Sequence, residues 1–415
     1  MPYCLNDIKN NFNEEKIKDL IKQYQPPFWV YDANIIYKKI KLLQEFDVIR
    51  FAQKSCSNIH ILRLMKNKNV KVDAVSLGEI QRALLSGFKH NTNDIVFTAD
   101  ILDDKTLSQV VNFNIPVNAG SLDMLEQLGK ASSGHNVWLR INPGFGYGHS
   151  KKTNTGGENS KHGIWDPLLA IPIIKKYQLK LIGLHMHIGS GVNYIHLKKV
   201  CKSMIENVIK LNQKISSISA GGGLPIPYKF NEKPINIKKY FILWDLARKE
   251  ISKFLGKKIE LEIEPGRFLV AESGILISQV WSVKKMGNKN FVLVDVGFND
   301  LMRPAMYGSY HHISVISGDN RNIDEKKTIK TVIAGPLCES GDIFTQKEGG
   351  TIQTRLLPII KKGDYLIFHD TGAYGASMSS NYNTRPLIPE ILLKNDNVML
   401  IRRRQKIEEI LSLEI

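Results

Sequence analysis

The sequence predicts an α/β protein: a closed (β/α)8 TIM-like barrel followed by a second, mostly β C-terminal domain. Eight short apolar runs alternate with amphipathic helical stretches over about 250 residues, which fits a closed parallel barrel better than an open sheet. From about residue 275 onward, apolar runs follow one another without helices between them and are separated by turn residues.

The eight barrel strands are predicted from short runs of apolar and β-branched residues. They are expected at residues 48–52, 70–75, 95–99, 115–119, 137–141, 179–188, 215–220 and 259–263. Between these runs, stretches such as 80–88 and 197–211 carry apolar residues at helical spacing. We expect the barrel domain to occupy residues 34–274.

The second domain is predicted from five apolar runs that are separated by turns. They lie at residues 275–283, 291–296, 331–334, 365–369 and 398–401. We expect residues 275–415 to form this β-rich domain together with residues 1–33. The basic cluster Arg402, Arg403 and Arg404 is expected to open a C-terminal helix.

Composition limits the classes of function. The chain has 415 residues, 43% of them hydrophobic, and a net charge of +17 from 57 basic and 40 acidic residues. The basic residues are dispersed in pairs such as Lys38-Lys39 and Lys175-Lys176, without the interleaved aromatic residues that bind single strands. We therefore interpret the charge as a solvated surface and expect no nucleic-acid partner.

The cysteines and the apolar runs indicate a reduced compartment. Cys4, Cys56, Cys201 and Cys338 are scattered without a CxxC pair, which argues against a zinc site or a disulfide framework. No apolar run is long enough to span a bilayer, and the polar residues 1–13 do not resemble a signal peptide. We expect a cytoplasmic protein with no membrane partner.

Candidate functional residues are expected at the C-terminal ends of the barrel strands, where barrel active sites are built. Lys54 follows the first strand and precedes the helix-starting pair Ser57-Asn58. A lysine held there partly out of water can present the neutral, nucleophilic amine that Schiff-base chemistry needs. Taken alone, a lysine at a strand end is more often solvated.

Two histidines, His185 and His187, end the sixth strand at a spacing that points both to one face. Such a pair could ligate a metal ion, but no further histidine ends a neighbouring barrel strand. We therefore expect no metal, and a ring-stacking or structural role for the pair.

Glycines and charged residues end other strands. Gly221, Gly222 and Gly223 follow the seventh strand and are predicted to form a nest of backbone N–H groups for a phosphate. The glycine-rich run 144–148 looks like a dinucleotide fingerprint, but no helix follows it, so we reject that interpretation. After the eighth strand, Glu264 and Arg267 place a carboxylate beside a guanidinium, which alone could be an ordinary ion pair.

A Schiff-base lysine, a phosphate nest, a stacking imidazole and a carboxylate are together the parts that bind pyridoxal 5′-phosphate (PLP) and drive its chemistry. The sequence resembles the fold-type III PLP-dependent decarboxylases, with their alanine racemase-like barrel, and among them the bacterial diaminopimelate decarboxylases. The resemblance covers essentially the whole chain. It rests on co-linear motifs at residues 51–54, 185–190, 221–223, 264–267, 335–342 and 372–374, extended by 142–145, 153–157, 161–164 and 301–307.

The resemblance implies roles for individual residues toward the cofactor. Lys54 would bind PLP covalently, His187 would stack on its ring, and Glu264 would keep its pyridine nitrogen protonated. The residues implied in binding the phosphate and the rest of the cofactor are Ser190, Gly221, Gly222, Gly223, Gly266, Arg267 and Tyr374.

The resemblance also implies how the substrate is recognised and converted. The non-reacting carboxylate of meso-2,6-diaminopimelate would meet Arg267, Arg303 and Tyr307, and the substrate-binding set is completed by Glu339 and Tyr374. Either Cys338 or Lys54 would return a proton to the α-carbon after carbon dioxide leaves. Because Cys338 and Glu339 would come from a partner subunit, a homodimer with shared active sites is expected. The predicted product is L-lysine, in the last step of lysine biosynthesis.

Three alternatives remain open at this stage. An ornithine or arginine decarboxylase would act on a substrate whose far end carries only a cation, which makes Arg303 unfavourable. An alanine racemase-like enzyme would share the barrel and the lysine but would not explain the 338–342 motif. A non-enzymatic PLP-binding protein would not need the β domain that carries Arg303, Cys338 and Tyr374.

Overall fold

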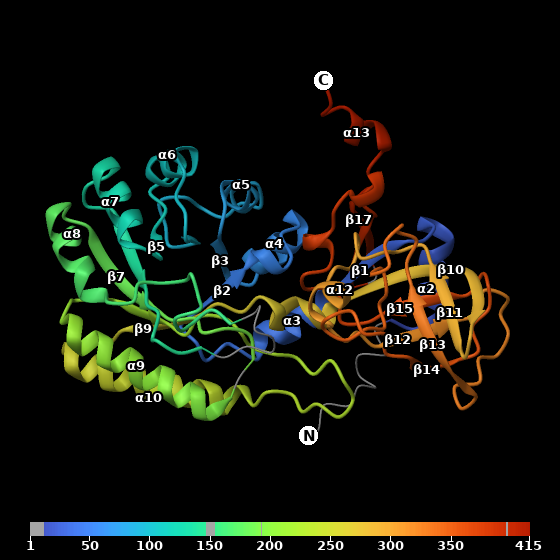
Figure 1. Cartoon of the computed structure of the whole chain (residues 1–415). Helices are drawn as coiled ribbons and strands as arrows, with labels where there is room; N and C mark the ends of the chain where they lie inside the picture. The colour runs from blue at the N-terminus through green and yellow to red at the C-terminus, as the bar shows by residue number, and fades with distance from the viewer. Residues whose placement is uncertain (1–11, 147–153, 192, 396) are drawn as a thin grey trace. The chain divides into compact units, whose positions relative to one another are not determined.

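The computed structural model describes residues 12–146, 154–191, 193–395 and 397–415, and the chain divides into two compact units. One unit comprises Tyr37–Pro225 and Ile235–Leu269, and the other comprises the residues up to Ile36 together with Ile226–Pro234 and Val270–Ile415. The segment Ile226–Pro234 thus belongs to the second unit, although it lies within the stretch 34–274 that the sequence assigns to the barrel. Figure 1 traces the chain through both units.

The first unit is a closed barrel of eight parallel strands, as predicted. The strands are β2 (Val48–Ala52), β3 (Lys71–Ala74), β4 (Ile95–Ala99), β5 (Val117–Ala119), β6 (Asn136–Arg140), β7 (Lys180–His185), β8 (Ser217–Ser219) and β9 (Glu260–Ile263). β9 pairs with β2 and so closes the ring. Each strand falls within one residue of, or inside, one of the eight predicted runs.

Helices alternate with the barrel strands (Figure 1). They are α3 (Ala33–Lys41), α4 (Ile59–Lys66), α5 (Leu77–Leu85), α6 (Asp104–Asn112), α7 (Leu122–Ala131), α8 (Ala170–Lys176), α9 (Tyr194–Leu211) and α10 (Ile237–Leu255). Several begin where a polar side chain accepts a hydrogen bond from a first-turn backbone N–H, which satisfies a group the helix leaves unpaired. These caps include Asn58, Ser76, Asp103, Ser121 and Asn193.

The barrel interior buries a complete ion pair below its functional end. Arg50 of β2 donates from Nε and Nη2 to the Glu262 carboxylate of β9, at 3.0 and 2.9 Å. A further nitrogen of Arg50 donates to the carbonyl oxygen of Asn93 at 3.0 Å. Because both charged side chains are almost fully buried, each depends on the other to balance its charge and to replace hydrogen bonds to water.

The second unit is built on a nine-stranded sheet. Its strands are β1 (Phe28–Asp32), β10 (Gly274–Met286), β11 (Lys289–Val294), β12 (Ile313–Ile316), β13 (Thr328–Ala334), β14 (Arg355–Pro358), β15 (Tyr365–Phe368), β16 (Glu390–Lys394) and β17 (Asn397–Arg402). The main path runs β14-β13-β11-β10-β1-β16-β17, and β15 pairs with β10 and β12. The fold class predicted from the sequence is therefore confirmed for both units.

Short helices and turns complete the two units. They are α2 (Glu14–Tyr24), α11 (Arg267–Val270), α12 (Arg303–Tyr307), α13 (Ile407–Leu411) and the 3-10 turns at Gln53–Ser55, Pro167–Leu169, Ala271–Ser273, Ala376–Met378 and Tyr382–Thr384. The apolar face of α2 packs into the core of the second unit with Phe28, Ile275 and Ile391. The segment that precedes the barrel is thus part of the β sheet's core.

Two predictions for the second unit need correction. The sequence analysis missed β1, β12, β14 and β16, which are short. The basic cluster does not open a helix, because Arg402 ends β17 and α13 begins only at Ile407. The arginines instead donate to backbone carbonyl oxygens, Arg402 to that of Ile388 and Arg404 to that of Pro27, each at 2.9 Å.

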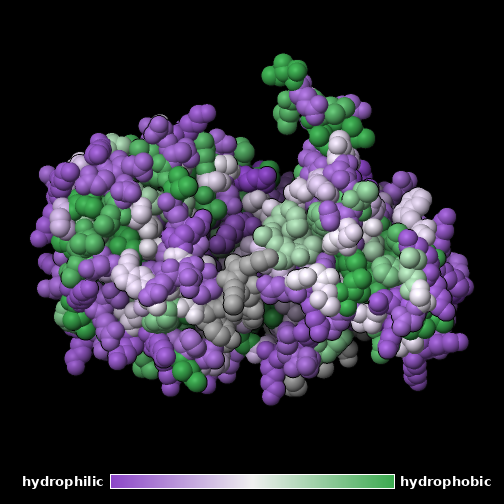
Figure 2. Space-filling model, in the orientation of Figure 1, coloured by the Kyte–Doolittle hydropathy of each residue, from purple (hydrophilic) through white to green (hydrophobic). Residues whose placement is uncertain are grey.

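The surface is largely polar. Figure 2 shows hydrophilic residues over much of the visible face of both units, with apolar residues gathered on the C-terminal segment, where Leu413 is 84% exposed. Across the part of the chain that the structure describes, no helix combines the length and apolar character needed to cross a membrane.

Candidate active site

The inward-facing residues at the C-terminal end of the barrel form a layer that is almost entirely polar and buried. We call it the polar ring, and it consists of Asp73, Thr98, Asn118, Arg140, His185, Ser219 and Glu264. Strand pairing brings neighbours together, since Thr98 lies opposite Asn118, and His185 lies opposite both Arg140 and Ser219. A barrel core usually fills such a layer with branched apolar side chains, so this layer is specialised for chemistry.

Glu264 is the best-supported member of the polar ring. His185 Nε2 lies 2.8 Å from one carboxylate oxygen, and the Ser219 hydroxyl donates to the other at 2.8 Å. Burial raises the pKa of Glu264, but the charge and hydrogen bond of His185 and the bond from Ser219 outweigh it and bring the pKa to about 2. Glu264 is therefore ionised at neutral pH inside the barrel.

Asp73 is the opposite case. Burial, followed by repulsion from the Glu264 carboxylate, raises the pKa of Asp73 to about 8. A hydrogen bond with Thr98 and the charge of Lys54 act the other way. Among the described residues, Asp73 Oδ1 has no hydrogen-bond partner. The ring therefore holds one ionised and one protonated carboxyl group at neutral pH, a difference in environment typical of active sites.

Arg140 is the ring's cation. It is 8% exposed. Burial lowers the pKa of its guanidinium, and the carboxyl groups of Asp100, Glu264 and Asp73 oppose that shift. The guanidinium therefore balances the acidic side chains in a region with little water.

Lys54 lies on the 3-10 turn Gln53–Ser55, directly after β2. The Ser55 hydroxyl donates to the carbonyl oxygen of Ala52 at 2.9 Å, and Gln53 and Ser55 are both buried. Gly266 packs against this turn so closely that a Cβ there would lie 3.2 Å from Ser55 Oγ. The turn that carries the lysine is therefore held by the chain after β9.

One expectation about Lys54 is wrong for the chain as described. The sequence analysis expected the lysine to be partly out of water, but its side chain is exposed. Its charge nevertheless acts on the buried Asp73 and on His187. The turn is fixed while the amine end stays accessible.

The three glycines after β8 form a cradle that no larger residue could build. A Cβ on Gly221 would lie 2.4 Å from the carbonyl oxygen of Met186, and one on Gly223 would lie 2.2 Å from that of Gly189. Gly221 and Gly223 also have positive φ, of 62° and 96°. The carbonyl oxygen of Gly223 accepts a hydrogen bond from Gly191 N at 2.8 Å. The cradle thus joins the loops after β7 and β8.

His187 lies beside this cradle. Its ring carbon Cε1 would be 3.4 Å from a Cβ on Gly223. Burial, followed by the charges of Arg140 and Lys54, lowers the pKa of His187 well below its ordinary value. The imidazole is therefore neutral at physiological pH, and among the described residues its Nδ1 has no hydrogen-bond partner. A neutral, flat ring is suited to stacking on an aromatic ligand.

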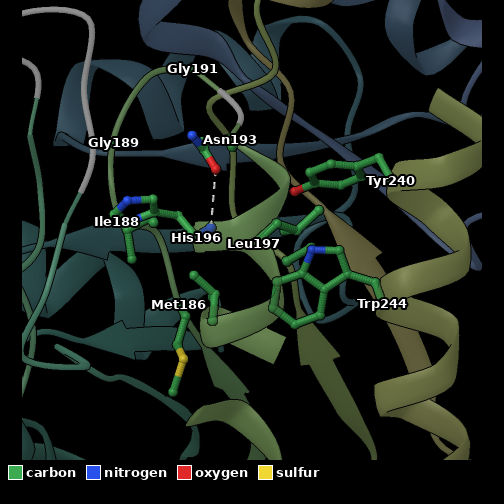
Figure 3. Close-up of a pocket in the computed structure, with 12 residues that line it drawn as sticks. Met186, Ile188, Gly189, Gly191, Asn193, His196, Leu197, Tyr240 and Trp244 are labelled. Carbon is green, nitrogen blue, oxygen red and sulfur yellow. Dashed lines mark hydrogen bonds between the residues drawn. The ribbon is translucent and has the colours of Figure 1, made fainter. Parts of the chain in front are cut away.

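A small cavity of about 30 Å³ adjoins the cradle. Figure 3 shows its lining, in which Gly189 and Gly191 of the β7 loop face Tyr240 and Trp244 of α10. The Asn193 side chain caps α9 by accepting from His196 N at 3.3 Å, a bond drawn in the same view. The lining residues of the cavity thus come from the β7 loop, the glycine cradle, α9 and α10.

Ser190 and Arg267, the first residue of α11, lie in the first unit, and the remaining predicted site residues lie in the second unit. Arg303 and Tyr307 are the first and last residues of α12, and Arg303 is 5% exposed. Tyr374 adopts a positive φ of 57°, between the buried residues Ala373 and Gly375. Such a conformation costs a tyrosine energy and is often found at functional sites.

The loop with Cys338 and Glu339 is shaped by a carboxylate. Asp342 accepts hydrogen bonds from the backbone N–H groups of Leu337 and Phe298, both at 2.8 Å. Cys338 and Glu339 themselves are exposed on the surface of their unit.

Sequence reasoning missed several contributors to the site. It considered His185 only as a possible metal or structural residue and did not predict its bond to Glu264, and it gave no role to Asp73 or Ser219. The HxH spacing placed His185 near the site, but the serine inside an apolar run carries no signal of its own. Residues 147–153, which include the end of the glycine-rich run 144–148 and the start of the motif 153–157, lie outside the described residues.

Among the described residues, no three or more His, Cys, Asp or Glu side chains are grouped as a metal site requires. The residues present do fit PLP. The glycine cradle offers backbone N–H groups to a phosphate, His187 offers a neutral ring, and Glu264 offers a permanent negative charge to a pyridinium nitrogen. Lys54 supplies the accessible amine. The donor set therefore matches each part of the cofactor.

Comparison with known proteins gives the same result. A family described as "Pyridoxal-dependent decarboxylase, pyridoxal binding domain" matches residues 33–271. The chain belongs to the pyridoxal-dependent decarboxylases.

Full-length relatives narrow the assignment to one group within the family, the diaminopimelate decarboxylases. The chain is 81% identical over 414 residues to the diaminopimelate decarboxylase of Buchnera aphidicola from Acyrthosiphon pisum, covering 100% of both. A crystal structure of diaminopimelate decarboxylase is 60% identical, with 97% of each chain covered and a TM-score of 0.95. The Helicobacter pylori diaminopimelate decarboxylase complexed with L-lysine is 31% identical, with a TM-score of 0.82 over 96% of this chain and 99% of that one.

Replacing Asp73 with Asn should change how stability depends on pH. A carboxyl group with a raised folded pKa stabilises the fold below its unfolded pKa of about 4. That contribution is lost as the pH rises toward the folded value of about 8. As the pH rises between these two values, the stability of the variant should therefore increase relative to that of wild type. The measurement is the urea midpoint of both proteins at each pH. The exposed Asp123→Asn variant serves as the control. A difference that stays constant across the range would contradict a buried, protonated Asp73.

Proposed function

We propose that the protein decarboxylates meso-2,6-diaminopimelate to L-lysine and carbon dioxide, the last step of lysine biosynthesis, with PLP as cofactor. The observation that carries the proposal is the ionised Glu264, held by His185 and Ser219 beside the glycine cradle and the Lys54 turn. Relatives that match this chain from end to end bear the name of the same reaction. The site and the relatives agree on both cofactor and chemistry.

The cofactor would supply the electron-accepting ring, and the residues of the protein would hold and orient it. PLP, when bound, supplies a conjugated ring that accepts the electrons left on the substrate's α-carbon as carbon dioxide departs. Lys54 would hold it through Nζ, His187 would lie against its ring, and Glu264 would keep a proton on the ring nitrogen. The phosphate would be bound by Ser190, Gly221, Gly222, Gly223 and Tyr374, with Gly266 and Arg267 completing the cofactor site.

The polar ring explains how Glu264 can perform this task. An isolated carboxylate in a barrel interior would take up a proton, because burial penalises its charge. His185 and Ser219 offset that penalty with one hydrogen bond to each oxygen. The carboxylate therefore remains negative and can hold a proton on a neighbouring ring nitrogen throughout the reaction.

We propose that Arg267, Arg303 and Tyr307 bind the distal carboxylate, and that Glu339 pairs with the distal ammonium while Tyr374 completes the pocket. The burial of Arg303 supports this role, since a guanidinium with little water around it gains most from a carboxylate partner. Either Cys338 Sγ or Lys54 Nζ would return the proton to the α-carbon.

We further propose a homodimer in which Cys338 and Glu339 serve the active site of the partner subunit. Both side chains are exposed on the surface of their own unit, on a loop fixed by Asp342, and are thus available to a second copy. A cytoplasmic location fits the biosynthetic reaction and the scattered cysteines.

The reaction is tested by supplying the PLP-loaded protein with meso-diaminopimelate, and in parallel with ornithine, arginine and lysine. We expect equal amounts of carbon dioxide and L-lysine from diaminopimelate and no measurable product from the other three. Arg303→Ala should raise KM for diaminopimelate by about 100-fold, because it removes charge-assisted hydrogen bonds to the distal carboxylate. Activity on ornithine with none on diaminopimelate would refute the proposed substrate.

The shared site is tested by complementation. Lys54→Ala and the double variant Cys338→Ala/Glu339→Ala should each lose most activity alone. Co-expressed, they form mixed dimers in which one of the two sites carries no substitution, so about a quarter of wild-type activity should return. Purification through two different tags confirms that mixed dimers form. Mixed dimers without recovered activity would mean that each subunit completes its own site.

A further inference from the structure

The guanidinium of Arg303 is held by a histidine that no part of the proposed mechanism uses. Nη1 of Arg303 lies 2.9 Å from Nε2 of His311, and His311 is 1% exposed. Both residues belong to the second unit, Arg303 on α12 and His311 just before β12. Such a contact inside a protein requires complementary donors and acceptors, so it fixes the protonation of the histidine.

The proton on His311 can be placed from this geometry. A guanidinium can only donate, so Nε2 of His311 must be the acceptor. The other ring nitrogen, Nδ1, lies 2.9 Å from the carbonyl oxygen of His369, which can only accept. The proton therefore sits on Nδ1, and the imidazole is neutral with both nitrogens satisfied. A protonated ring would face Arg303 with a second donor and a second positive charge.

The aromatic ring of Tyr228 contacts both Arg303 and His311. The guanidinium carbon of Arg303 lies 4.8 Å from the centre of the Tyr228 ring, within cation–π range. Tyr228 also meets His311 edge to face, with ring centres 5.5 Å apart at 80°. Tyr228 comes from Ile226–Pro234, the segment that leaves the barrel stretch of the sequence to join the second unit. The segment thus brings the aromatic face on which the guanidinium rests.

Further groups hold His311 itself. Arg355 donates from Nη1 to the backbone carbonyl oxygen of His311. His369, whose carbonyl accepts from His311, also stacks at a tilt on His312, with ring centres 5.2 Å apart. Arg303, Arg355, His369 and Tyr228 therefore all contact His311.

We propose that His311 is a positioning residue for substrate recognition, which holds the Arg303 guanidinium in the orientation that binds the distal carboxylate of the substrate. This inference rests on the proposed function of Arg303. One donor of the guanidinium is engaged by His311 and its face by Tyr228, so the remaining N–H groups are fixed in direction before substrate arrives. Preorganisation of this kind lowers the entropy cost of binding.

The proposal predicts a specific kinetic signature. The imidazole acts on the distal end of the substrate and not on the reacting α-carbon, so its loss should raise KM and leave kcat nearly unchanged. The product L-lysine keeps the distal carboxylate, so its inhibition constant should rise in parallel. Inhibition by 1,5-diaminopentane, which has no carboxylate, should stay the same.

The test compares His311→Phe and His311→Gln in the PLP-loaded enzyme. Phenylalanine keeps the ring against Tyr228 but has no acceptor, and we expect KM for diaminopimelate to rise by about 10- to 100-fold with kcat within about threefold of wild type. Glutamine offers an acceptor oxygen and should restore KM to within about fivefold of wild type. His90→Phe, the same exchange at an exposed histidine of the first unit, is the control and should leave KM unchanged. Cofactor absorbance verifies that each variant binds PLP.

A double variant makes the test decisive. If His311 acts through Arg303, then His311→Phe should change KM by less than about twofold when Arg303 is already alanine. Additive effects, or an unchanged KM in His311→Phe while Arg303→Ala raises it, would overturn the positioning role and leave the proposed function intact. If wild type itself does not convert diaminopimelate, the proposed function fails first, and the two failures are thus distinguished.

Discussion

The structure depends on keeping one carboxylate charged in the interior of a barrel. Glu264 lies where most barrels place branched apolar residues, and its charge survives only because His185 and Ser219 each supply a hydrogen bond at 2.8 Å. These three residues come from β7, β8 and the end of β9, so the carboxylate is stabilised only when the strands are in register. The register of the barrel strands thus positions the charged residue of the proposed cofactor site.

The rest of the polar ring follows from this constraint. A second ionised carboxylate so close to Glu264 would be repelled, and Asp73 is accordingly shifted toward its protonated form. Arg140 supplies the balancing positive charge. His187, beside the glycine cradle, is neutral and adds no second positive charge. Lower in the barrel, Arg50 and Glu262 form a buried ion pair, and the charge of Arg50 also helps to lower the pKa of Glu264. The buried charges of the barrel therefore act on one another.

The sequence predicted the barrel well because each of its strands is a compact apolar run between helices. It predicted the second unit less completely. β1 pairs with β10 and β16, whose residues are hundreds of positions away, so no local turn or hairpin signal marks this short strand. The arginines at 402–404 looked like the start of a helix, but they donate to carbonyl oxygens at the end of a strand. Local charge does not reveal such distant acceptors.

For the site, the motifs identified residues that carry chemistry but not the residues that support them. Lys54, the glycine cradle and Glu264 stand out because lysine, repeated glycine and a carboxylate at strand ends are unusual. Ser219 and His311 do not stand out, because their importance comes from a partner in another strand or helix. Tyr228 was hidden for a different reason, since it lies in a segment that crosses from one unit to the other. Supporting contacts of this kind become visible only in three dimensions.

The most direct test of the central role of Glu264 is the rate of decarboxylation in Glu264→Gln. Glutamine keeps the shape and can still accept from Ser219, but it carries no charge. The account predicts a protein that folds and binds PLP, with kcat on diaminopimelate lower by about 100-fold or more and KM changed little. A kcat within about threefold of wild type would contradict the claim that the buried negative charge drives the reaction.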